Sequence, residues 1–513
     1  MQLPLKIDAQ KKMTLQSQIV EQIRRMILDG HLRSGDFLPT TRALSEQVGI
    51  SRNTTMQAYE RLMAEGYIQT RPYVGTFVSA EIPESAFFAN ACRCETGFSD
   101  DGPIADLELS SRLAGLRAHG VVNPNKERLV ADFWVGRPAA DAFPLKTWSH
   151  VVRRRLARSG RVFCEYRDPA GFSDLRQAIA DHLGPTRGLT ADPEQIVIVG
   201  GAQEGLNLVA RLLLEAETPV VIESPCYQGA AYLFESLGAD LVPVPVDEGG
   251  IDVAQIPDVS RALAYVTPSH QYPLGVTLTL ERRLQLLAWA SASNSYIIED
   301  DYDSNFRFVG SPVTALKGLD RGDRVFYLGT FSKCMGPSLR LGFVVLPRAF
   351  AAPAKALKAL MNNGQPWLEQ AAMADFMMSG AYARHLRRLR QMYLSRRNAT
   401  LAAITRHFGE ADVIGTEAGM HLVWRLPEGL PPAAEIERRA LAVGVGVYTL
   451  NTGAAHHFGG TDESRRHLVL GYAALSEAEI DLGISRLAGC LGWTSTATGR
   501  SRPARSITAG AMR

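Results

Sequence analysis

Apolar residues in the first eighty positions recur with the spacing of helices. The opening helix has an apolar residue at every fourth position: Leu15, Ile19, Ile23 and Ile27. Two shorter helical stretches follow, and in the second, from Arg52 to Glu65, four residues are expected to face the core: Ala58, Tyr59, Leu62 and Met63. Two brief strands, 67–70 and 76–78, come next around a turn. This succession predicts a compact domain over residues 13–80, with three helices and a β-wing.

From about residue 131 the pattern changes to short apolar strands separated by helical stretches. Six strands are expected: Ile196–Val199, Val220–Ile222, Leu263–Val266, Tyr296–Ile298, Val325–Leu328 and Gly342–Leu346. Runs that are apolar throughout and alternate with helices favour a mostly parallel sheet covered on both faces. After residue 353 the pattern is first helical and then mixed, which predicts a smaller α+β lobe. The chain is therefore expected to be multidomain, with an α/β domain over residues 131–490.

Between and beyond these domains the pattern fades. Residues 81–130 mix Ser, Gly, Pro and Asp with brief apolar clusters, as a linker does. Residues 491–513 are rich in Ser, Thr, Gly and Arg and are predicted to form a disordered basic tail. The first eighty residues hold ten Lys/Arg against seven Asp/Glu, and the last twenty-three hold four Arg and no acid. Positive charge is thus concentrated at the two ends, although the net charge is only +2.

The composition bounds the kind of protein. A hydrophobic content of 46% and a charged content of 21% are typical of a soluble globular protein. The six cysteines lack paired C-x-x-C spacing, so no metal site is expected and the thiols are predicted to be reduced. No apolar leader begins the chain, and no run approaches eighteen apolar residues. We expect a cytoplasmic protein that does not bind a membrane.

The second and third helices are joined through Gly49-Ile50, which would present the start of the third helix to a DNA major groove. Four polar residues begin that helix: Ser51, Arg52, Asn53 and Thr54. Hydrogen-bonding side chains in this position read base edges or bind phosphates. Arg42 suits a phosphate contact, and the wing carries Arg71 and Gly75. Each residue alone would fit a solvated face equally well.

The whole string is more specific than its parts. The segment LPTTRALSEQVGISRNTTMQAYERLMAEGYIQTRPYVGTFVS resembles the winged helix-turn-helix of GntR-type bacterial regulators. The resemblance implies double-stranded operator DNA as a partner. It also implies four DNA-contacting positions: Arg42, Arg52, Thr54 and Gly75. One departure is Tyr73-Val74, where the family usually has Gly-Ser before the Gly.

A lysine at the end of a predicted strand is the first of three features that indicate pyridoxal phosphate. The run 325–328 leads through Thr330 and Ser332 into Lys333. An amine at a strand end can form an imine with an aldehyde, while Thr330, Ser332 and Arg340 offer donors and charge to a phosphate. A Ser-Lys pair alone is no signal, since most lysines are solvated.

The other two features lie at the ends of neighbouring predicted strands. The carboxylate of Asp300 could keep a pyridine nitrogen protonated, and Tyr302 could bond the phenolic oxygen of the ring. Tyr227 could stack on that ring, or it could be a core aromatic. A glycine turn would point free N–H groups and a helix dipole at an anion, through Gly201, Ala202 and Gln203. Alone, such a turn is more often an ordinary βα connection.

The order and spacing of these features resemble fold-type I aminotransferases over residues 131–490. The blocks GRPAADAFPLKTW, YRDPAGFSDLRQAIADHL, TPSHQYPLG and GTFSKCMGPSLRLGF are similar to corresponding blocks of that family. The resemblance implies that Lys333 is the Schiff-base lysine, Asp300 the pyridinium partner and Tyr302 the donor to the phenolic oxygen. Tyr227 becomes the stacking ring and Arg340 a phosphate ligand. Tyr166 would reach the phosphate of a neighbouring subunit, which implies a dimer.

A GntR-like winged helix joined by a linker to such a domain resembles the MocR family of bacterial transcription regulators. The block VTPSHQYPLG is closer to that family than to dedicated aminotransferases, which usually carry Asn where Tyr272 stands. The resemblance implies a domain-swapped homodimer that binds DNA and responds to pyridoxal phosphate, in some members with an amino compound as effector. A PdxR-like member would regulate vitamin B6 supply.

Two positions favour sensing over catalysis. Val469 stands where aminotransferases place the arginine that pairs with a substrate carboxylate, and valine cannot replace that contact. A shifted alignment would restore the charge through Arg465 or Arg466. Gly229 also supplies no charge where amino-acid-sensing relatives can carry arginine.

Three functions stay open at this point. The first is a transcription regulator that senses pyridoxal phosphate or an amino compound. The second is an active aminotransferase with an appended DNA-binding domain, in which Lys333 moves a proton as general acid and base. The third is a DNA-binding protein that has lost the cofactor, which the intact cofactor residues speak against.

Overall fold

The computed structural model describes residues 2–8, 13–80, 129–158, 160–460 and 464–493. The chain divides into two compact units, Met1–Glu108 and Leu109–Arg513. Most of the predicted linker and most of the predicted tail lie outside the described residues, as do Cys92 and Cys94.

The N-terminal unit has the predicted helices, each with a hydroxyl cap. Thr14, Thr40 and Ser51 precede α1 (Leu15–Leu28), α2 (Thr41–Val48) and α3 (Arg52–Ala64), and each accepts a backbone N–H from the first turn. Gly49 ends α2 in the left-handed conformation that favours glycine. The wing is an antiparallel pair of β1 (Ile68–Arg71) and β2 (Gly75–Val78).

The core of this unit forms around the predicted face of α1. Ile19, Ile23 and Ile27 are buried against residues of α2 and α3, including Tyr59, whose hydroxyl donates to the Pro39 carbonyl at 2.8 Å. The expectation for Met63 was wrong: its side chain is 36% exposed. The buried face of α3 is filled by other side chains, and the Met63 sulfur instead accepts a hydrogen bond from Thr70 of the wing.

The large unit contains an eight-stranded sheet. Its strands, in spatial order, are β4 (Ile196–Val199), β12 (Gly342–Val345), β11 (Val325–Thr330), β10 (Tyr296–Asp301), β9 (Leu263–Val266), β5 (Pro219–Ser224), β7 (Asp240–Asp247) and β8 (Gly250–Ile251). All six predicted strands are present. The sheet is mostly parallel, as predicted, but β12 runs antiparallel to both neighbours. Strands β7 and β8 were not predicted, because prolines and acidic residues interrupt their apolar pattern.

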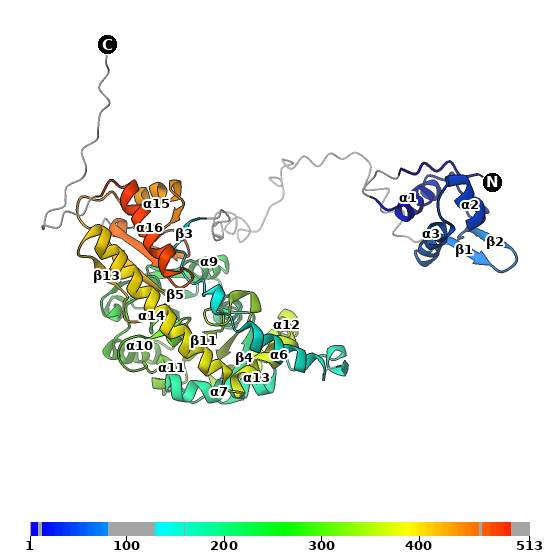
Figure 1. The fold of residues 1–513 in the computed structure, drawn as a ribbon. Coiled ribbons are helices and arrows are strands. Elements are labelled where there is room, and N and C mark those ends of the chain that lie inside the picture. Colours follow the sequence, from blue (N-terminus) through cyan, green and yellow to red (C-terminus); the bar gives the residue numbers. More distant parts are fainter. Residues whose placement is uncertain (1, 9–12, 81–128, 159, 461–463, 494–513) are drawn as a thin grey trace, which may run out of the picture. The chain divides into compact units, whose positions relative to one another are not determined.

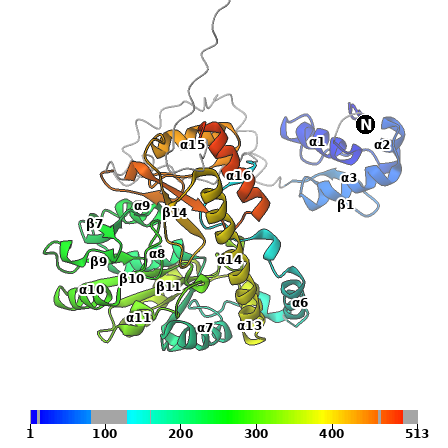
Figure 2. The same cartoon turned by 60° about the vertical axis from the view of Figure 1, so that its left-hand side comes forward.

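Helices cover both faces of this sheet (Figures 1 and 2). Alternate residues of β4 show the two layers, because Ile198 packs in one apolar cluster and Val197 and Val199 in another. The helices on one face are α8 (Ala202–Leu213), α9 (Gln228–Ser236) and α12 (Ala351–Asn362); those on the other include α7 (Ser173–Arg187), α10 (Leu280–Ala292) and α11 (Leu316–Leu319). Two further helices, α6 (Leu145–Leu156) and α13 (Trp367–Met378), pack against each other, and α13 also packs against α7.

The remaining elements form a smaller α+β lobe, as predicted. They are α14 (Ala381–Phe408), β13 (Asp412–Ile414), β14 (His421–Arg425), α15 (Ala433–Ala442), β17 (His467–Gly471) and α16 (Glu477–Cys490). Strands β13, β14 and β17 make an antiparallel sheet, and α14 packs along α16. The first strand of the domain, β3 (Ala131–Asp132), pairs with β15 (Val445–Gly446), so the start of the domain belongs to this lobe.

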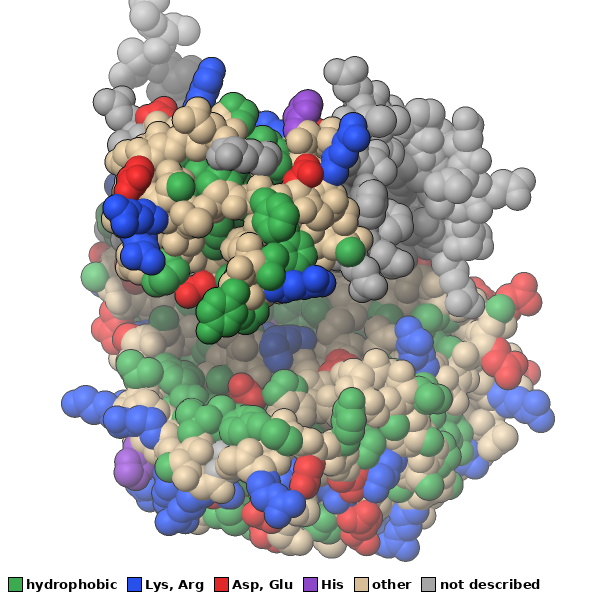
Figure 3. Space-filling model, turned by 90° about the vertical axis from the view of Figure 1, so that its right-hand side faces the viewer, with side chains coloured by type: hydrophobic (Ala, Val, Ile, Leu, Met, Phe, Trp, Pro, Cys, Tyr) green, Lys and Arg blue, Asp and Glu red, His purple; other side chains and the backbone are tan. Residues whose placement is uncertain are grey.

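The described helices include none that is long and apolar enough to cross a membrane. On the face that Figure 3 shows, Lys and Arg side chains are interspersed with Asp and Glu rather than gathered in one large area. That distribution agrees with the small net charge of the chain.

Candidate functional site

A cavity of about 220 Å³ lies where β10 and β11 end. It is lined by Val135, Gly136, Ala202, Gln203, Tyr227, Tyr265, Thr267, Tyr272, Asp300, Tyr302, Thr330, Ser332, Lys333, Pro337, Arg340 and Ala454. The structure thus brings nearly all the predicted cofactor residues together in one cavity. Gly201 adjoins it through Arg340, whereas Tyr166 lies away from it and is 93% exposed.

The Lys333 amine is held inside this cavity. Its Nζ donates to the Gly136 carbonyl at 3.3 Å. Gly136 has φ of 85°, a conformation that favours glycine, and a Cβ added there would come within 2.5 Å of Nζ and displace the amine. Burial lowers the pKa of Lys333, while the charges of Asp303 and Asp300 oppose the shift. A larger neutral fraction makes the amine a better nucleophile toward an aldehyde.

The Asp300 carboxylate has one partnered and one unpartnered oxygen. The Tyr265 hydroxyl donates to Oδ2 at 2.8 Å, and Oδ1 is buried with no hydrogen-bond partner among the described residues. Burial raises the pKa of Asp300 to about 7, the Tyr265 bond opposing it. A buried acceptor without a partner suits a ligand that brings its own N–H, as a protonated pyridine ring does. The unpartnered Asp300 oxygen therefore fits the ring nitrogen of pyridoxal phosphate.

Donors suited to a phosphate gather at another part of the cavity. Helix α8 begins there at Ala202 without a side-chain cap, so its positive end is available to an anion. Arg340 adopts a left-handed backbone conformation, and its guanidinium would lie 3.2 Å from a Cβ at Gly201. Thr330 is the last residue of β11 and Ser332 follows the strand, with the Thr330 hydroxyl donating to the Ser332 hydroxyl at 3.0 Å.

Aromatic rings form the remaining wall. Tyr227 and Tyr272 meet edge to face with ring centroids 6.1 Å apart, and the Tyr227 hydroxyl donates to the Gln203 side chain at 3.3 Å. A Cβ at Gly229 would come within 2.5 Å of the Tyr227 ring. The absence of a side chain at 229 therefore allows the present position of Tyr227, and an arginine there would displace it.

The position expected to bind a substrate carboxylate is apolar. Val469 is buried in β17 against Val423 and Leu450. The shifted alignment does not restore the charge, because Arg466 donates to the backbone carbonyls of Leu426 and Leu430 at 3.0 Å each, and Arg465 is exposed. Among the described residues, these two arginines do not line the cavity.

Residues that the sequence did not indicate complete the lining. Gly136 and Ala454 come from loops that are distant in sequence from β10 and β11. Tyr265 lies on β9 and Thr267 directly after it. The side chain of Glu223 holds the loop after β9, since it accepts bonds from the Thr267 hydroxyl at 2.6 Å and from the Gln271 amide at 3.2 Å. No motif in the chain pointed to these long-range contacts.

The predicted DNA-contacting residues lie at the exposed start of α3 and beside it. Arg52 and Asn53 are exposed, whereas the Ser51 hydroxyl is engaged as a helix cap by Thr54, through its backbone N–H at 3.1 Å and its hydroxyl at 2.8 Å. Arg42 is exposed on α2 and pairs with Glu46 one turn on.

The wing residues differ in their contacts and in their backbone conformation. The Arg71 guanidinium lies 5.1 Å from the centre of the Phe77 ring. At the wing tip, Tyr73 has φ of 62° and is fully exposed, while Gly75 has φ of 127°. A left-handed tyrosine at the tip replaces the glycine usual in the resembling family, and it makes the tip bulkier and apolar.

Both units of the chain resemble known protein families. Residues 15–78 match the family of bacterial regulatory proteins of the gntR family, and residues 135–487 match aminotransferase class I and II. A probable rhizopine catabolism regulatory protein, MocR, from Rhizobium meliloti is 35% identical over 487 residues, which cover 94% of this chain and 95% of that protein. The chain belongs to the MocR family. Its relatives are named HTH-type transcriptional regulators, which supports regulation over metabolic catalysis.

Other members of the MocR family and solved structures extend the likeness. The pyridoxine biosynthesis regulator PdxR of Corynebacterium glutamicum is 34% identical and aligns with 77% of this chain and 80% of its own length. The α-aminoadipate aminotransferase LysN of Thermus thermophilus is 28% identical, with a TM-score of 0.64 over 71% of this chain and 92% of its own. A kynurenine aminotransferase of Pyrococcus horikoshii is 25% identical, with a TM-score of 0.65 over 77% of this chain and 98% of its own. The large domain thus has the fold of a pyridoxal-phosphate-dependent family.

Burial of Glu223 predicts a measurable pH dependence of stability. Burial raises its pKa from 4.5 to about 7, although bonds from Thr267 and Gln271 lower it. Since the folded state binds this proton more tightly than the unfolded state, the stabilisation is present below pH 4.5 and is lost as the pH rises through 7. Glu223→Gln keeps the shape and the acceptor, so its free energy of unfolding should fall less over that pH range in denaturant titrations. The exposed Glu428→Gln is the control, and equal slopes in all three proteins would contradict the assignment.

The position of Arg52 predicts a salt-dependent loss of DNA binding. Arg52→Ala should weaken binding to a duplex from upstream of the protein's own gene and reduce the salt slope of the affinity by about 1, because one phosphate contact is lost. Fluorescence anisotropy at several salt concentrations measures both. Arg61→Ala is the matched control, since Arg61 is at the other end of α3 and pairs with Glu65 at 2.8 Å. Equal losses in both variants would show that the start of α3 does not face DNA.

Proposed function

We propose that this MocR-family regulator binds pyridoxal phosphate at Lys333 and uses it as the sensed ligand or as the anchor for an amino compound. The observation that carries the proposal is the cavity itself. It places the buried Lys333 amine and the unpartnered Asp300 oxygen on one ligand-sized space, with Arg340 and the start of α8 beside it. When bound, pyridoxal phosphate supplies an aldehyde that amines condense with and a ring that withdraws electrons.

The predicted cofactor residues would bind different parts of the ligand. Lys333 would hold the aldehyde carbon, Asp300 the ring nitrogen and Tyr302 the phenolic oxygen. The phosphate would be bound by side chains and backbone of five residues: Gly201, Ala202, Thr330, Ser332 and Arg340. Tyr227, with Gln203 bonded to its hydroxyl, would lie against the ring.

The apolar surroundings of Val469 favour sensing over turnover. A substrate α-carboxylate placed there would lose its hydration without gaining a cation, and an unpaired buried charge is costly. The enzyme alternative keeps support from the complete set of cofactor residues. Mixing the protein with candidate amino acids and a keto acid separates the two, because an aminotransferase gives many turnovers and the proposed sensor at most one half-reaction.

The DNA-binding unit gives the regulator its output. Arg42, Arg52, Asn53, Thr54, Arg71 and Gly75 are proposed to contact operator DNA, and Ser51 to cap the helix that reads it. The exposed Tyr166 suits a contact with a second copy of the chain, so we propose a homodimer in which Tyr166 reaches the partner's phosphate site. The domain-swapped arrangement and the cytoplasmic location belong to the same proposal.

The absorption spectrum of the purified protein tests the ligand. With pyridoxal phosphate added and excess removed, the wild-type protein should be yellow, and Lys333→Ala should lose the yellow band because no amine remains to hold the aldehyde. Lys146→Ala, an exposed lysine of α6, is the matched control and should keep the band. A yellow Lys333→Ala protein, or a colourless wild type, would overturn the proposal.

A further inference from the structure

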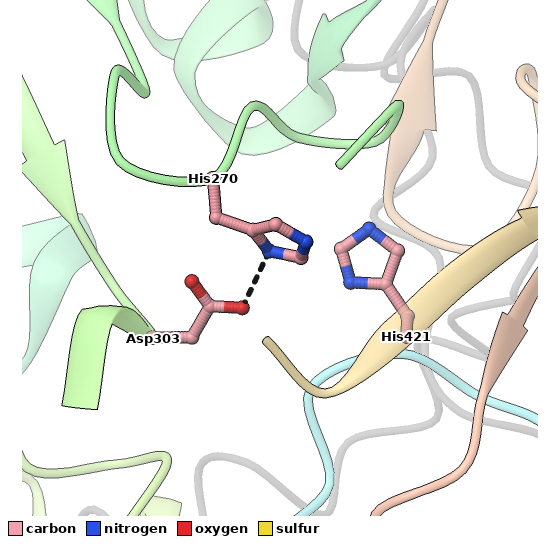
Figure 4. Close-up of side chains that lie close together, drawn as sticks. All are labelled: His270, Asp303 and His421. Carbon is pink, nitrogen blue, oxygen red and sulfur yellow. Dashed lines mark hydrogen bonds and ion pairs between the residues drawn. The ribbon is translucent and has the colours of Figure 1, made fainter. Parts of the chain in front are cut away.

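Behind the Tyr302 wall of the cavity lies a buried cluster of His270, Asp303 and His421 (Figure 4). The three side chains are at most 2% exposed and come from the loop after β9, the turn after β10 and the start of β14. None of them lines the cavity. Polar groups buried in this way are costly unless they form a satisfied network, so their arrangement calls for a reason.

The hydrogen atom on His270 Nδ1 is fixed by Asp303. Nδ1 lies 2.8 Å from the Asp303 Oδ2 atom and 3.1 Å from the Tyr302 hydroxyl oxygen. A carboxylate can only accept, so Nδ1 carries the hydrogen and donates it. With Nδ1 already a donor, the Tyr302 oxygen can only accept from it, and the Tyr302 proton must point elsewhere. Burial and the charge of Asp303 raise the pKa of Tyr302 well above its usual value, so that proton is kept.

His421 packs beside His270 as a neutral ring. Its Nε2 lies 2.9 Å from the Pro273 carbonyl, which can only accept, so the hydrogen is on Nε2 and Nδ1 has a free lone pair. Burial lowers the pKa of His421 well below its usual value, so the ring stays neutral. The centroids of the two imidazole rings are 4.8 Å apart and the ring planes are tilted by 54° (Figure 4). His270 Nε2 and His421 Nδ1 have no hydrogen-bond partner among the described residues.

Two glycines make room for this geometry. A Cβ added at Gly419 would come within 2.1 Å of the His270 ring and 2.7 Å of Asp303 Oδ2, and one at Gly275 within 3.0 Å of His270 Nε2. The His270 ring is therefore enclosed by backbone as well as by its hydrogen-bond partners. It cannot turn away from Tyr302 without moving two chain segments.

We propose that His270 is a positioning residue that donates to Asp303 and to the Tyr302 hydroxyl oxygen, and so directs the Tyr302 proton into the cavity, toward the phenolic oxygen of a bound pyridoxal phosphate. Asp303 selects the donating form of His270, and the His421 ring packs beside it. This assignment rests on the proposed binding of pyridoxal phosphate at Lys333. Tyr302 touches the ligand, and His270 acts only through Tyr302.

The pH midpoint of the yellow absorption of the loaded full-length protein reports on this hydrogen bond. A donor on the phenolic oxygen withdraws negative charge and weakens the hold on the Schiff-base proton, so Tyr302→Phe should raise the midpoint. His270→Asn keeps an amide N–H near the position of Nδ1 and should stay close to wild type. His270→Gln places its amide near Nε2 instead and should raise the midpoint, by up to about tenfold in proton affinity if one hydrogen bond is lost.

A double variant separates positioning from a general electrostatic effect. If His270 acts through Tyr302, the pair His270→Gln with Tyr302→Phe should show the midpoint of Tyr302→Phe alone. Additive shifts, an unmoved midpoint in a loaded His270→Gln protein, or equal shifts in the Asn and Gln variants would overturn the assignment. A shift caused by a metal chelator in the wild type would overturn it too, by showing a metal ion among the three side chains. A wild type that never turns yellow would instead refute the proposed ligand, and the role of His270 with it.

Discussion

The parallel pairing of β10 with β11 is the constraint on which the site depends. Asp300 lies opposite Leu328 in that register, and each strand leads directly into the residues that face the cavity. The pairing thereby brings a buried carboxylate and a buried amine to the same end of the sheet, where open α/β folds bind ligands. Neither group is satisfied by the protein alone: Lys333 has one long bond to a carbonyl, and Asp300 has an oxygen without a partner among the described residues. A ligand with an aldehyde and a ring nitrogen would complete both.

The smaller lobe supplies the residues at the expected carboxylate position. Its strand β17 presents Val469 within an apolar cluster, and Arg466, just before β17, donates to backbone carbonyls. The same lobe contributes His421 from β14, behind the Tyr302 wall. Among the described residues no arginine occupies the position of Val469, which is why we propose that the site reports the presence of a ligand, in keeping with membership of a family of transcription regulators.

Much of this could be predicted because the signals are local. The strand ends around Asp300 and Lys333, the hydroxyl caps and the glycine after α2 are each encoded within a few neighbouring residues. The failures came where distant segments compete. Met63 was expected inside, but the core face of α3 was already filled. Strand β7 was not predicted because prolines interrupt its apolar pattern. The contributions of Gly136 and Ala454 to the cavity depend on chain segments hundreds of residues apart. His270 and His421 meet only through the tertiary fold, so no spacing in the sequence could show their contact.

We propose that ligand binding at Lys333 and DNA binding by α3 are coupled in one regulator. The most direct test is the affinity of the full-length protein for a duplex from upstream of its own gene, measured by fluorescence anisotropy at fixed salt with and without pyridoxal phosphate. We expect pyridoxal phosphate to change the wild-type affinity and to leave that of Lys333→Ala unchanged, because a ligand shifts DNA binding only through its own site. Wild-type affinity that does not respond, or an equal response in Lys333→Ala, would show that Lys333 does not couple the ligand to DNA binding.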